Sequence, residues 1–460
     1  MPPASPSAPA APPAAELTLV RAMGPVALAA GIVNVTVGGG IFRLPATVAA
    51  TLGAAAPLAY LVCAAAMGLI VLCFAEAGSR VAMTGGPYAY VEVAFGPFVG
   101  FLSGVLLWLV GTFALAAVAT LLADALVGLA PGAAALGAGP GGAAARAAVL
   151  ALVLGGLAAV NAAGVRQGAR LNTAATVAKL VPLAVVVVAG LFLVRAEHLR
   201  VAAAPAPGAL ARSAVVLVFA FAGVESALVP SGEVRDPART VPRAVALAMA
   251  GVTGLYLALQ LVAQGVLGPA LASSPAPLAA VAERAFGAPG RGLLLTGAAV
   301  SMFGYVSGMT LAVPRALFAF ARDGLLPRAL ARVHPRHRTP HVAIWVQTAL
   351  VWALAASGTF ERLAVLANVS TLLLYAACCV AAWALWRRDV RPAGAPPADA
   401  APPPRVPFHP AVPWLALGVI ALLLTGAEPE EWAVVLGVLA AAAAGYALTG
   451  RGRRPAPAAA

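Results

Sequence analysis

The stretch Val37-Gly38-Gly39-Gly40-Ile41-Phe42 decides the fold, because it places three consecutive glycines inside the first long apolar run, residues 23–49. A glycine costs about 1 kcal/mol relative to alanine inside a helix. In hydrocarbon, a freed backbone amide or carbonyl costs more still unless it lines a polar cavity. The stretch therefore predicts a broken membrane helix beside a cavity that holds a small molecule. The alternative is that the glycines only allow close helix packing.

Composition indicates a polytopic membrane protein. The chain has 460 residues, of which 62% are hydrophobic and 10% charged, whereas soluble domains carry about 25% charged residues. The net charge of +13 comes from arginines that lie singly or in short groups between apolar runs. This pattern reflects membrane topology and argues against nucleic-acid binding, which requires a continuous basic face.

Twelve runs are long enough to cross a membrane, since about 20 apolar residues span ~30 Å of hydrocarbon. They cover residues 23–49, 53–79, 97–128, 146–164, 172–194, 212–231, 241–267, 291–320, 340–358, 362–386, 411–427 and 431–449. We therefore expect a ten-helix core over 21–386 and two peripheral helices over 411–450. Residues 1–20 read as a disordered Pro/Ala tail, 387–410 as a cytoplasmic Pro-rich loop and 451–460 as a cytoplasmic tail.

Charged and cysteine residues complete the topology. With the N-terminus in the cytoplasm, 20 of the 29 basic residues fall on the inner side and seven on the outer side. The positive-inside rule therefore places both termini in the cytoplasm. The four cysteines lie inside apolar runs without metal-type spacing, which predicts reduced packing residues. They are Cys63, Cys73, Cys378 and Cys379.

The ten core runs divide into two fives, 21–194 and 212–386. The sixth run reads Phe219-Ala220-Phe221-Ala222-Gly223-Val224-Glu225-Ser226, again a glycine with polar neighbours at membrane depth. An odd number of crossings in each half makes the halves inverted relative to one another. Paired interruptions at corresponding positions indicate the central site of a transporter built from inverted repeats.

Three charged residues lie close to these interruptions. Glu225 sits near mid-bilayer, where an ionisable group is functional by default, and burial there favours its protonated form; the alternative is a structural hydrogen bond to the broken helix. Lys179, the only lysine, is either a fixed ammonium near the breaks or a snorkelling side chain. Arg43 follows the glycines directly and faces an outer vestibule in our interpretation. Glu76 and Asp124, near helix ends, are expected at the membrane interface.

Four motifs resemble the amino-acid permeases of the amino acid, polyamine and organocation (APC) superfamily. They are GGGIFRLPATVAA at 38–50, AEAGSRVAMTGGPYAYVEVAFGPFVGF at 75–101, FAGVESALVPSGEVRDPARTVPRAV at 221–245 and ARDGLLPRALARVHPRHRTPHVAI at 321–344. The resemblance implies an all-α integral membrane fold of the LeuT type. In that fold twelve helices include a five-plus-five inverted repeat, and the first and sixth helices are broken.

The resemblance also implies roles for individual residues. The substrate carboxylate would bind the amides of Gly38, Gly39 and Gly40, and its ammonium the carbonyls around Ile32, Phe219, Ala220 and Ala222. Phe219 would cover the substrate, with Val224 also at the site, and Met309 would join Arg43 at a gate or vestibule. Glu225 resembles the proton-sensing glutamate of basic-substrate exchangers, whereas Lys179 resembles the lysine of neutral and cationic amino-acid carriers. Gly39 departs from the usual serine, so a hydroxyl contact to the carboxylate is lost.

These observations predict a secondary active amino-acid transporter in the cell (inner) membrane, coupled to protons or working by exchange. Its expected partners are an amino acid, protons and the lipid bilayer, with no cofactor; the sequence does not define the oligomeric state. The alternative is an exchanger of basic amino acids or polyamines. A membrane enzyme is disfavoured because the sequence contains no cluster of His, Asp, Cys or Ser near one interface, and the five histidines predict no metal site.

Overall fold

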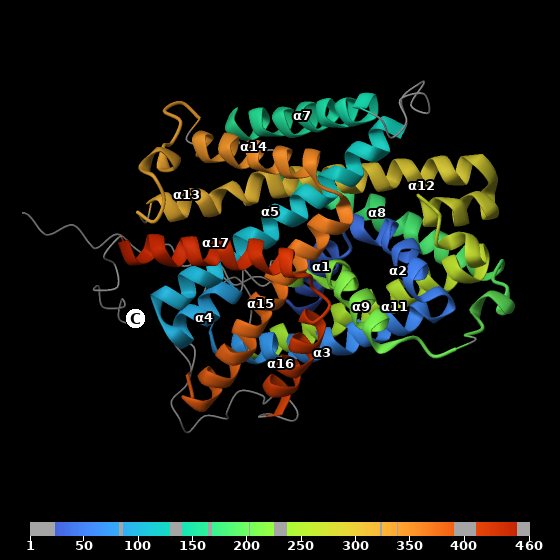
Figure 1. Cartoon of the computed structure of the whole chain (residues 1–460), viewed down its shortest axis with the longest axis horizontal. Coiled ribbons are helices and arrows are strands. Elements are labelled where there is room, and N and C mark those ends of the chain that lie inside the picture. Colours follow the sequence, from blue (N-terminus) through green and yellow to red (C-terminus); the bar gives the residue numbers. More distant parts are fainter. Residues whose placement is uncertain are drawn as a thin grey trace, which may run out of the picture.

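The computed structural model describes residues 24–81, 86–128, 140–163, 168–201, 203–224, 237–322, 324–337, 339–390 and 411–448. Within these residues the regular structure is entirely helical (Figure 1). In this described part of the chain, seven helical stretches are long and apolar enough to cross a membrane, and four shorter helices are also apolar. The predicted all-helical membrane class is confirmed. The predicted tails 1–20 and 451–460, and residues 391–410 of the predicted loop, lie outside the described residues.

Prolines fix where many helices begin. Their ring presets the helical φ, and the missing N–H would be unpaired in the first turn. Proline occupies the first or second position of α1, α2, α3, α4, α9 and α12. The α-helices are α1 (Pro25–Thr36), α2 (Leu44–Leu52), α3 (Ala56–Arg80), α4 (Pro87–Phe95), α5 (Pro97–Gly128), α7 (Pro140–Ala163), α8 (Gly168–Leu191), α9 (Pro207–Phe221), α11 (Pro237–Leu267), α12 (Pro277–Ala312), α13 (Pro314–Arg322), α14 (His341–Ser357), α15 (Phe360–Arg387), α16 (Ala411–Leu424) and α17 (Pro429–Leu448). Short 3-10 helices are η1 (Gly39–Phe42), η2 (Gly53–Ala55), η3 (Ala196–Leu199), η5 (Gly268–Leu271) and η6 (Arg328–Ala331).

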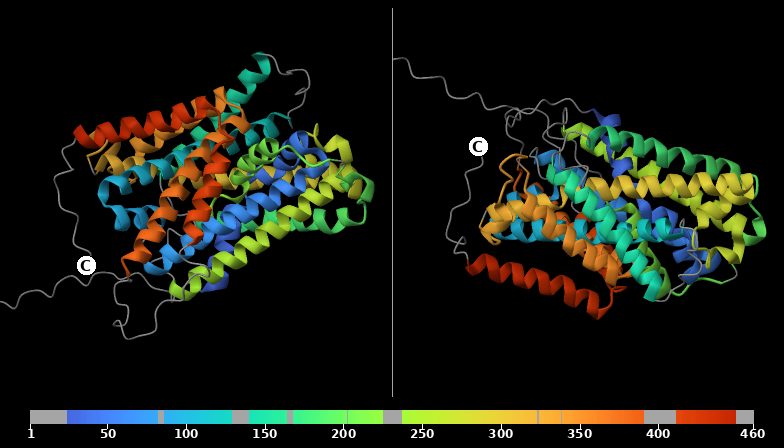
Figure 2. Two further views of the ribbon diagram at one scale, coloured as in Figure 1. Left: turned by 60° about the horizontal axis from the view of Figure 1, so that its bottom comes forward. Right: turned by 90° about the horizontal axis from the view of Figure 1, so that it is seen from above.

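Helices far apart in the sequence pack in pairs. The most extensive contacts join α5 to α15, α3 to α11, α8 to α12 and α7 to α14. Of the most apolar stretch in each helix, 83% is buried in α5 but only 11% in α17. Accordingly α17 lies at the margin of the bundle in both views of Figure 2. The centre of the molecule is therefore built around α5 and α15.

Large apolar side chains cover the outside of several helices. Leu152 on α7 is 77% exposed and Val188 on α8 is 60% exposed. Soluble monomers rarely expose extended apolar surface of this kind, so lipid is the medium that fits these faces. The four cysteines are all buried, as expected for packing residues.

One helix starts earlier than the sequence suggested. Residues 291–320 were predicted as a span, but α12 begins at Pro277. It bends at Gly287, whose φ of +70° is non-helical, just before Pro289. Glu283 and Arg284 interrupt the apolar pattern in this first piece, and for that reason hydropathy alone missed it.

Candidate functional site

The first predicted break lies between α1 and α2. Helix α1 ends at Thr36, and the 3-10 turn η1 begins at Gly39. Between them Gly38 has extended backbone angles (φ −95°, ψ −164°), and its N–H donates to the Thr36 carbonyl at 2.8 Å. Helix α2 then resumes with Pro45 in its first turn. The chain therefore unwinds at the glycines, as the sequence predicted.

The second break follows α9. The helix ends at Phe221, Ala222 is extended (φ −66°, ψ 153°), and Gly223 has a φ of +122°, which side-chain-bearing residues rarely adopt. A Cβ atom at Gly223 would lie 3.1 Å from Val35 Cγ1 and 3.3 Å from Thr36 Cα. The second break therefore packs directly against the end of α1, and glycine is required for that approach.

A cavity of about 400 Å³ lies where the two breaks meet. Predicted site residues on its wall are Gly38, Gly39, Gly40, Phe219, Ala220, Ala222 and Met309. Ile32 and Val224 are placed differently: both are fully buried in the hydrophobic core. Ile32 lies one turn before the break, inside intact α1, which keeps its side chain in the packed interior.

The cavity wall also includes residues that sequence reasoning did not single out. Trp108, Tyr305 and Asn368 line it from α5, α12 and α15. The Trp108 Nε1–H donates to Gln347 Oε1 at 2.9 Å, and the Asn368 Nδ2 donates to the Val215 carbonyl at 2.8 Å. None of the described residues that line the cavity has a charged side chain. The site therefore offers backbone polarity and neutral side chains to a ligand.

Arg43 lies in a second cavity, of about 570 Å³, beyond the breaks. Its Nε is 3.8 Å from Glu361 Oε1, and its Nη1 donates to the Pro275 carbonyl at 3.1 Å. A second pair, Arg146 and Asp124, lines the same cavity at 3.3 Å. Arg43 is therefore held by neighbouring groups away from the first cavity.

An apolar layer separates the two cavities. Phe219 lines the first cavity and Phe360 the second, and their rings meet edge to face with centroids 5.5 Å apart. Beside them Val118 lines the first cavity and Met302 lines the second, and both side chains lie close to Gly39. These side chains lie between the two cavities, and the lining of the first cavity includes Ala316 on α13.

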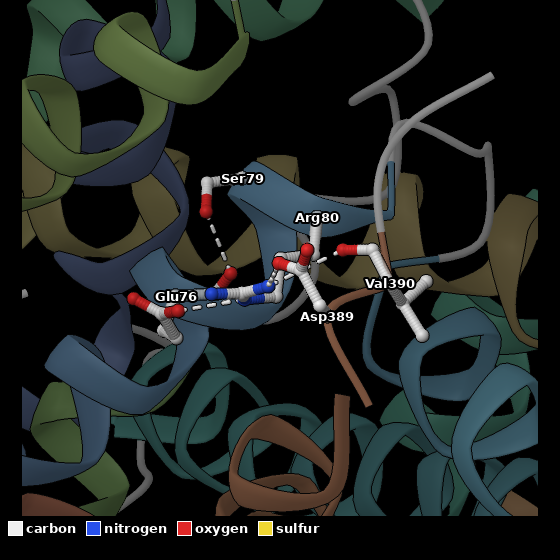
Figure 3. Close-up of polar contacts among 5 residues, drawn as sticks. All are labelled: Glu76, Ser79, Arg80, Asp389 and Val390. Carbon is white, nitrogen blue, oxygen red and sulfur yellow. Dashed lines mark hydrogen bonds and ion pairs between the residues drawn. The ribbon is translucent and has the colours of Figure 1, made fainter. Parts of the chain in front are cut away.

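A buried ion pair lies elsewhere in the bundle, near the end of α3. Arg80 Nε is 2.7 Å from Glu76 Oε1, and the two side chains are only 5% and 3% exposed. Arg80 also reaches the end of α15, with Nη1 3.3 Å from the Val390 carbonyl and 3.6 Å from Asp389 Oδ1 (Figure 3). Glu76 was expected at the membrane interface; it lies near its helix end, but its side chain is buried in protein.

The two predicted coupling residues are Lys179 and Glu225. Lys179 lies in α8, a helix that packs against α12 and α11. Glu225 directly follows Val224 and lies outside the described residues. Their roles stay predictions from the sequence.

Comparison with known proteins identifies similar transporters. A family model described as amino acid permease matches residues 23–440. The methylthioribose transporter of Bacillus subtilis is 28% identical over 411 residues, 87% of this chain and 87% of that protein. An uncharacterized transporter of Mycobacterium tuberculosis is 33% identical over 365 residues, 77% of this chain and 78% of that protein. The serine/threonine exchanger of Bacillus subtilis is 28% identical over 403 residues, 84% and 86% of the two chains.

Proposed function

Because this chain belongs to the amino acid permease family, we propose that it carries an amino acid across the cell membrane as a secondary active transporter. The observation that supports this best is the uncharged cavity of about 400 Å³ at the meeting point of two helix breaks. In transporters with inverted repeats, substrates bind near the bilayer midplane between discontinuous helices. A cavity of this volume between two interrupted helices suits an amino acid.

The backbone of the two breaks supplies the recognition of the substrate's common groups. The carboxylate binds at the N–H groups of Gly39 and Gly40, and also at that of Gly38 once this N–H leaves the Thr36 carbonyl. The ammonium binds at carbonyls of Phe219, Ala220 and Ala222. All six residues line the cavity. Because half-helix ends carry partial charges of opposite sign at their two termini, one cavity can hold both groups of a zwitterion. Ile32 and Val224 are buried in the hydrophobic core near the two breaks.

The substrate's side chain is neutral in this proposal. A cationic side chain or a polyamine would need a buried carboxylate for its second positive charge, and the described lining residues include none. Two similar proteins are named for uncharged side chains or ligands, the serine/threonine exchanger and the methylthioribose transporter. A basic amino acid or polyamine is therefore the second candidate and an outcome to be tested.

We extend the proposal to topology and mechanism. The break after α1 interrupts the first helix, and the break after α9 interrupts the sixth helix, of a twelve-helix fold with a five-plus-five inverted repeat. In this fold α16 and α17 are peripheral. Both termini lie in the cytoplasm, on the side that receives Arg315 and Arg322, which both lie in α13. The first cavity then faces the cytoplasm and the Phe219–Phe360 layer closes the outer side. Alternating access requires this layer to separate and the inner path to close, with Arg43 and Met309 at the gates.

A ligand screen tests the substrate class directly. Purified protein is heated with each of the twenty amino acids, common polyamines and methylthioribose, and its melting temperature is recorded. A ligand at 100 times its Kd stabilises the folded state by about 2.7 kcal/mol, so a neutral amino acid is expected to raise the melting temperature by several degrees. Stabilisation by polyamines or arginine alone would support the second candidate instead. Uptake of the best ligand into proteoliposomes then establishes transport.

Proton coupling is tested at Glu225. We expect Glu225→Gln to flatten the pH dependence of uptake into proteoliposomes, because the amide cannot take up or release a proton. Lys179→Ala serves as the companion variant, since a fixed ammonium in α8 is the alternative coupling element. An unchanged pH profile in Glu225→Gln, together with a lost one in Lys179→Ala, would transfer the role to Lys179.

A further inference from the structure

Trp108 brings a large aromatic ring from α5 to the wall of the first cavity. Its Nε1–H donates to Gln347 Oε1 on α14 at 2.9 Å. Gln347 is only 1% exposed and does not line the cavity. The nitrogen edge of the indole therefore points toward α14, and ring carbons form the surface that meets a ligand.

Gln347 is itself held by the helix that carries Trp108. Its Nε2–H donates to Thr112 Oγ1 at 2.9 Å, and the Thr112 hydroxyl donates to the Trp108 carbonyl at 2.8 Å. An indole N–H can only donate, and the Thr112 hydroxyl has already used its one proton. The carboxamide must therefore present its oxygen to Trp108 and its nitrogen to Thr112, which fixes the orientation of the Gln347 side chain.

The burial of this carboxamide makes the arrangement rigid. A polar group in a membrane span is costly unless its atoms are paired, and side-chain amides in such spans form hydrogen bonds between helices. Gln347 and Thr112 are each 1% exposed. If the indole turned away, its own N–H and the Gln347 Oε1 would both lose their partner inside the protein. The hydrogen bonds that satisfy Gln347 therefore also hold Trp108 in one orientation.

The neighbours of Trp108 on its own helix leave this task to α14. Gly104 and Gly111 lie four residues before and three residues after Trp108, so they share its face of α5. Both glycines line the cavity with Trp108. Because neither has a side chain, they cannot hold the indole from above or below. The bond from Gln347 supplies that restraint from the adjacent helix.

Several further side chains on the cavity wall are apolar, among them Leu107, Val110 and Met309. We propose that Gln347 is a positioning residue: it holds the Trp108 indole with its N–H turned away from the cavity, so that the site selects an amino acid with a large apolar side chain. This inference rests on the proposed function and narrows its neutral substrates to apolar ones. Gln347 acts through the indole and not by touching the substrate.

The orientation of Trp108 is tested without ligand, by fluorine NMR of protein labelled with 5-fluorotryptophan. The Trp108 resonance is assigned by its loss in Trp108→Phe. Gln347→Met keeps a side chain of similar length and removes the acceptor, so the Trp108 resonance should shift or broaden. The Trp352 resonance serves as the internal reference, because its Nε1–H donates from α14 to the Ala147 carbonyl at 3.0 Å. An unchanged Trp108 resonance in Gln347→Met would overturn the proposal.

Gln260→Met is the matched control. Gln260 is also a fully buried glutamine in a long apolar helix, α11, and its Nε2 donates to Gln264 Oε1 at 3.2 Å. It does not line the cavity. Both variants therefore remove a buried carboxamide, but only Gln347→Met frees the indole. Gln260→Met should leave the Trp108 resonance as in the wild type, and an equal change in both variants would count against a specific role of Gln347.

Selectivity is tested by competition of leucine and serine against radiolabelled leucine. The wild-type protein should bind leucine more tightly than serine. Gln347→Met should weaken leucine binding by about tenfold, because a buried hydrogen bond is lost and its donor is left unpaired. Serine, which does not reach the indole with an apolar group, should change by less than about threefold. Equal losses for both ligands, or tighter binding of serine to the wild type, would overturn the proposal.

A second variant covers a folding defect. If Gln347→Met does not fold, 3-benzothienylalanine is placed at position 108, since it keeps the shape of the indole and carries sulfur in place of the N–H. It should show the same selective loss of leucine affinity, and wild-type affinity for leucine would overturn the proposal. If none of the twenty amino acids binds the wild-type protein, the proposed function fails, while the fluorine spectrum still decides whether Gln347 holds Trp108.

Discussion

Gly40→Ala is expected to weaken substrate binding by about tenfold or more while the protein stays folded, because overpacking a tight site costs roughly 1–3 kcal/mol. A Cβ atom at Gly40 would lie 2.9 Å from Cδ1 of Phe219 and 3.2 Å from Cδ1 of Leu44. The Phe219 ring cannot easily retreat, since it is packed edge to face on Phe360. The added methyl group therefore displaces the aromatic ring that covers the proposed site.

Gly38→Ala is the matched control. The nearest atom to a Cβ at Gly38 is the Thr36 carbonyl oxygen, at 3.9 Å, and the extended φ of −95° suits any residue. Alanine there keeps the amide and adds no contact, so binding should stay within about threefold of the wild type, less than 1 kcal/mol. Gly39→Val should abolish binding, since a Cβ there would lie 3.0 Å from Met302 Cγ before the two valine methyl groups are added.

Binding is measured by the thermal shift with ligand and by uptake into proteoliposomes. Wild-type affinity in both Gly38→Ala and Gly40→Ala would mean that space at the break is not limiting, and would contradict the placement of the substrate beside Phe219. Equal losses in both variants, with melting temperatures unchanged, would instead indicate that the glycines serve backbone flexibility in transport.

The helix breaks could be predicted because their signal is local. Three adjacent glycines in an apolar run, and a glycine followed by Glu225 in another, mark positions where a membrane helix cannot continue. The chain unwinds at Gly38 and at Gly223. The apolar runs likewise predicted most of the helices, because hydropathy depends on neighbouring residues only.

The partners of the breaks could not be predicted in this way. Tyr256 in α11 has no sequence pattern that sets it apart. Its buried hydroxyl donates a hydrogen bond to the carbonyl of Thr36, 220 positions earlier in the chain. Asn368 was visible as a polar residue in an apolar run, but its position on the cavity wall depends on how α15 packs on α5. Ile32, near whose carbonyl the resemblance placed the substrate ammonium, has its side chain in the hydrophobic core, and its role stays a prediction.

The second large effect is expected at Arg80, away from the cavity. Arg80→Met should lower the free energy of unfolding by about 3–5 kcal/mol, the usual cost of removing one member of a buried ion pair. Glu76 is only 3% exposed and lies 2.7 Å from the guanidinium Nε that the substitution removes. Its carboxylate would then be held in the interior without that cation.

Asp389→Asn distinguishes the contribution of the buried Arg80–Glu76 pair from that of the exposed Arg80–Asp389 pair, because it changes only the exposed one. Asp389 is 63% exposed and 3.6 Å from Arg80 Nη1, and exposed pairs contribute about 0–1 kcal/mol. Unfolding in mixed detergent micelles should therefore respond strongly to Arg80→Met and weakly to Asp389→Asn. The double variant Glu76→Gln with Arg80→Met should regain much of the lost stability, since it removes both charges. If the double variant is as unstable as Arg80→Met, the arginine acts through its bond to the Val390 carbonyl, which would make the link from α3 to the end of α15 the stabilising element.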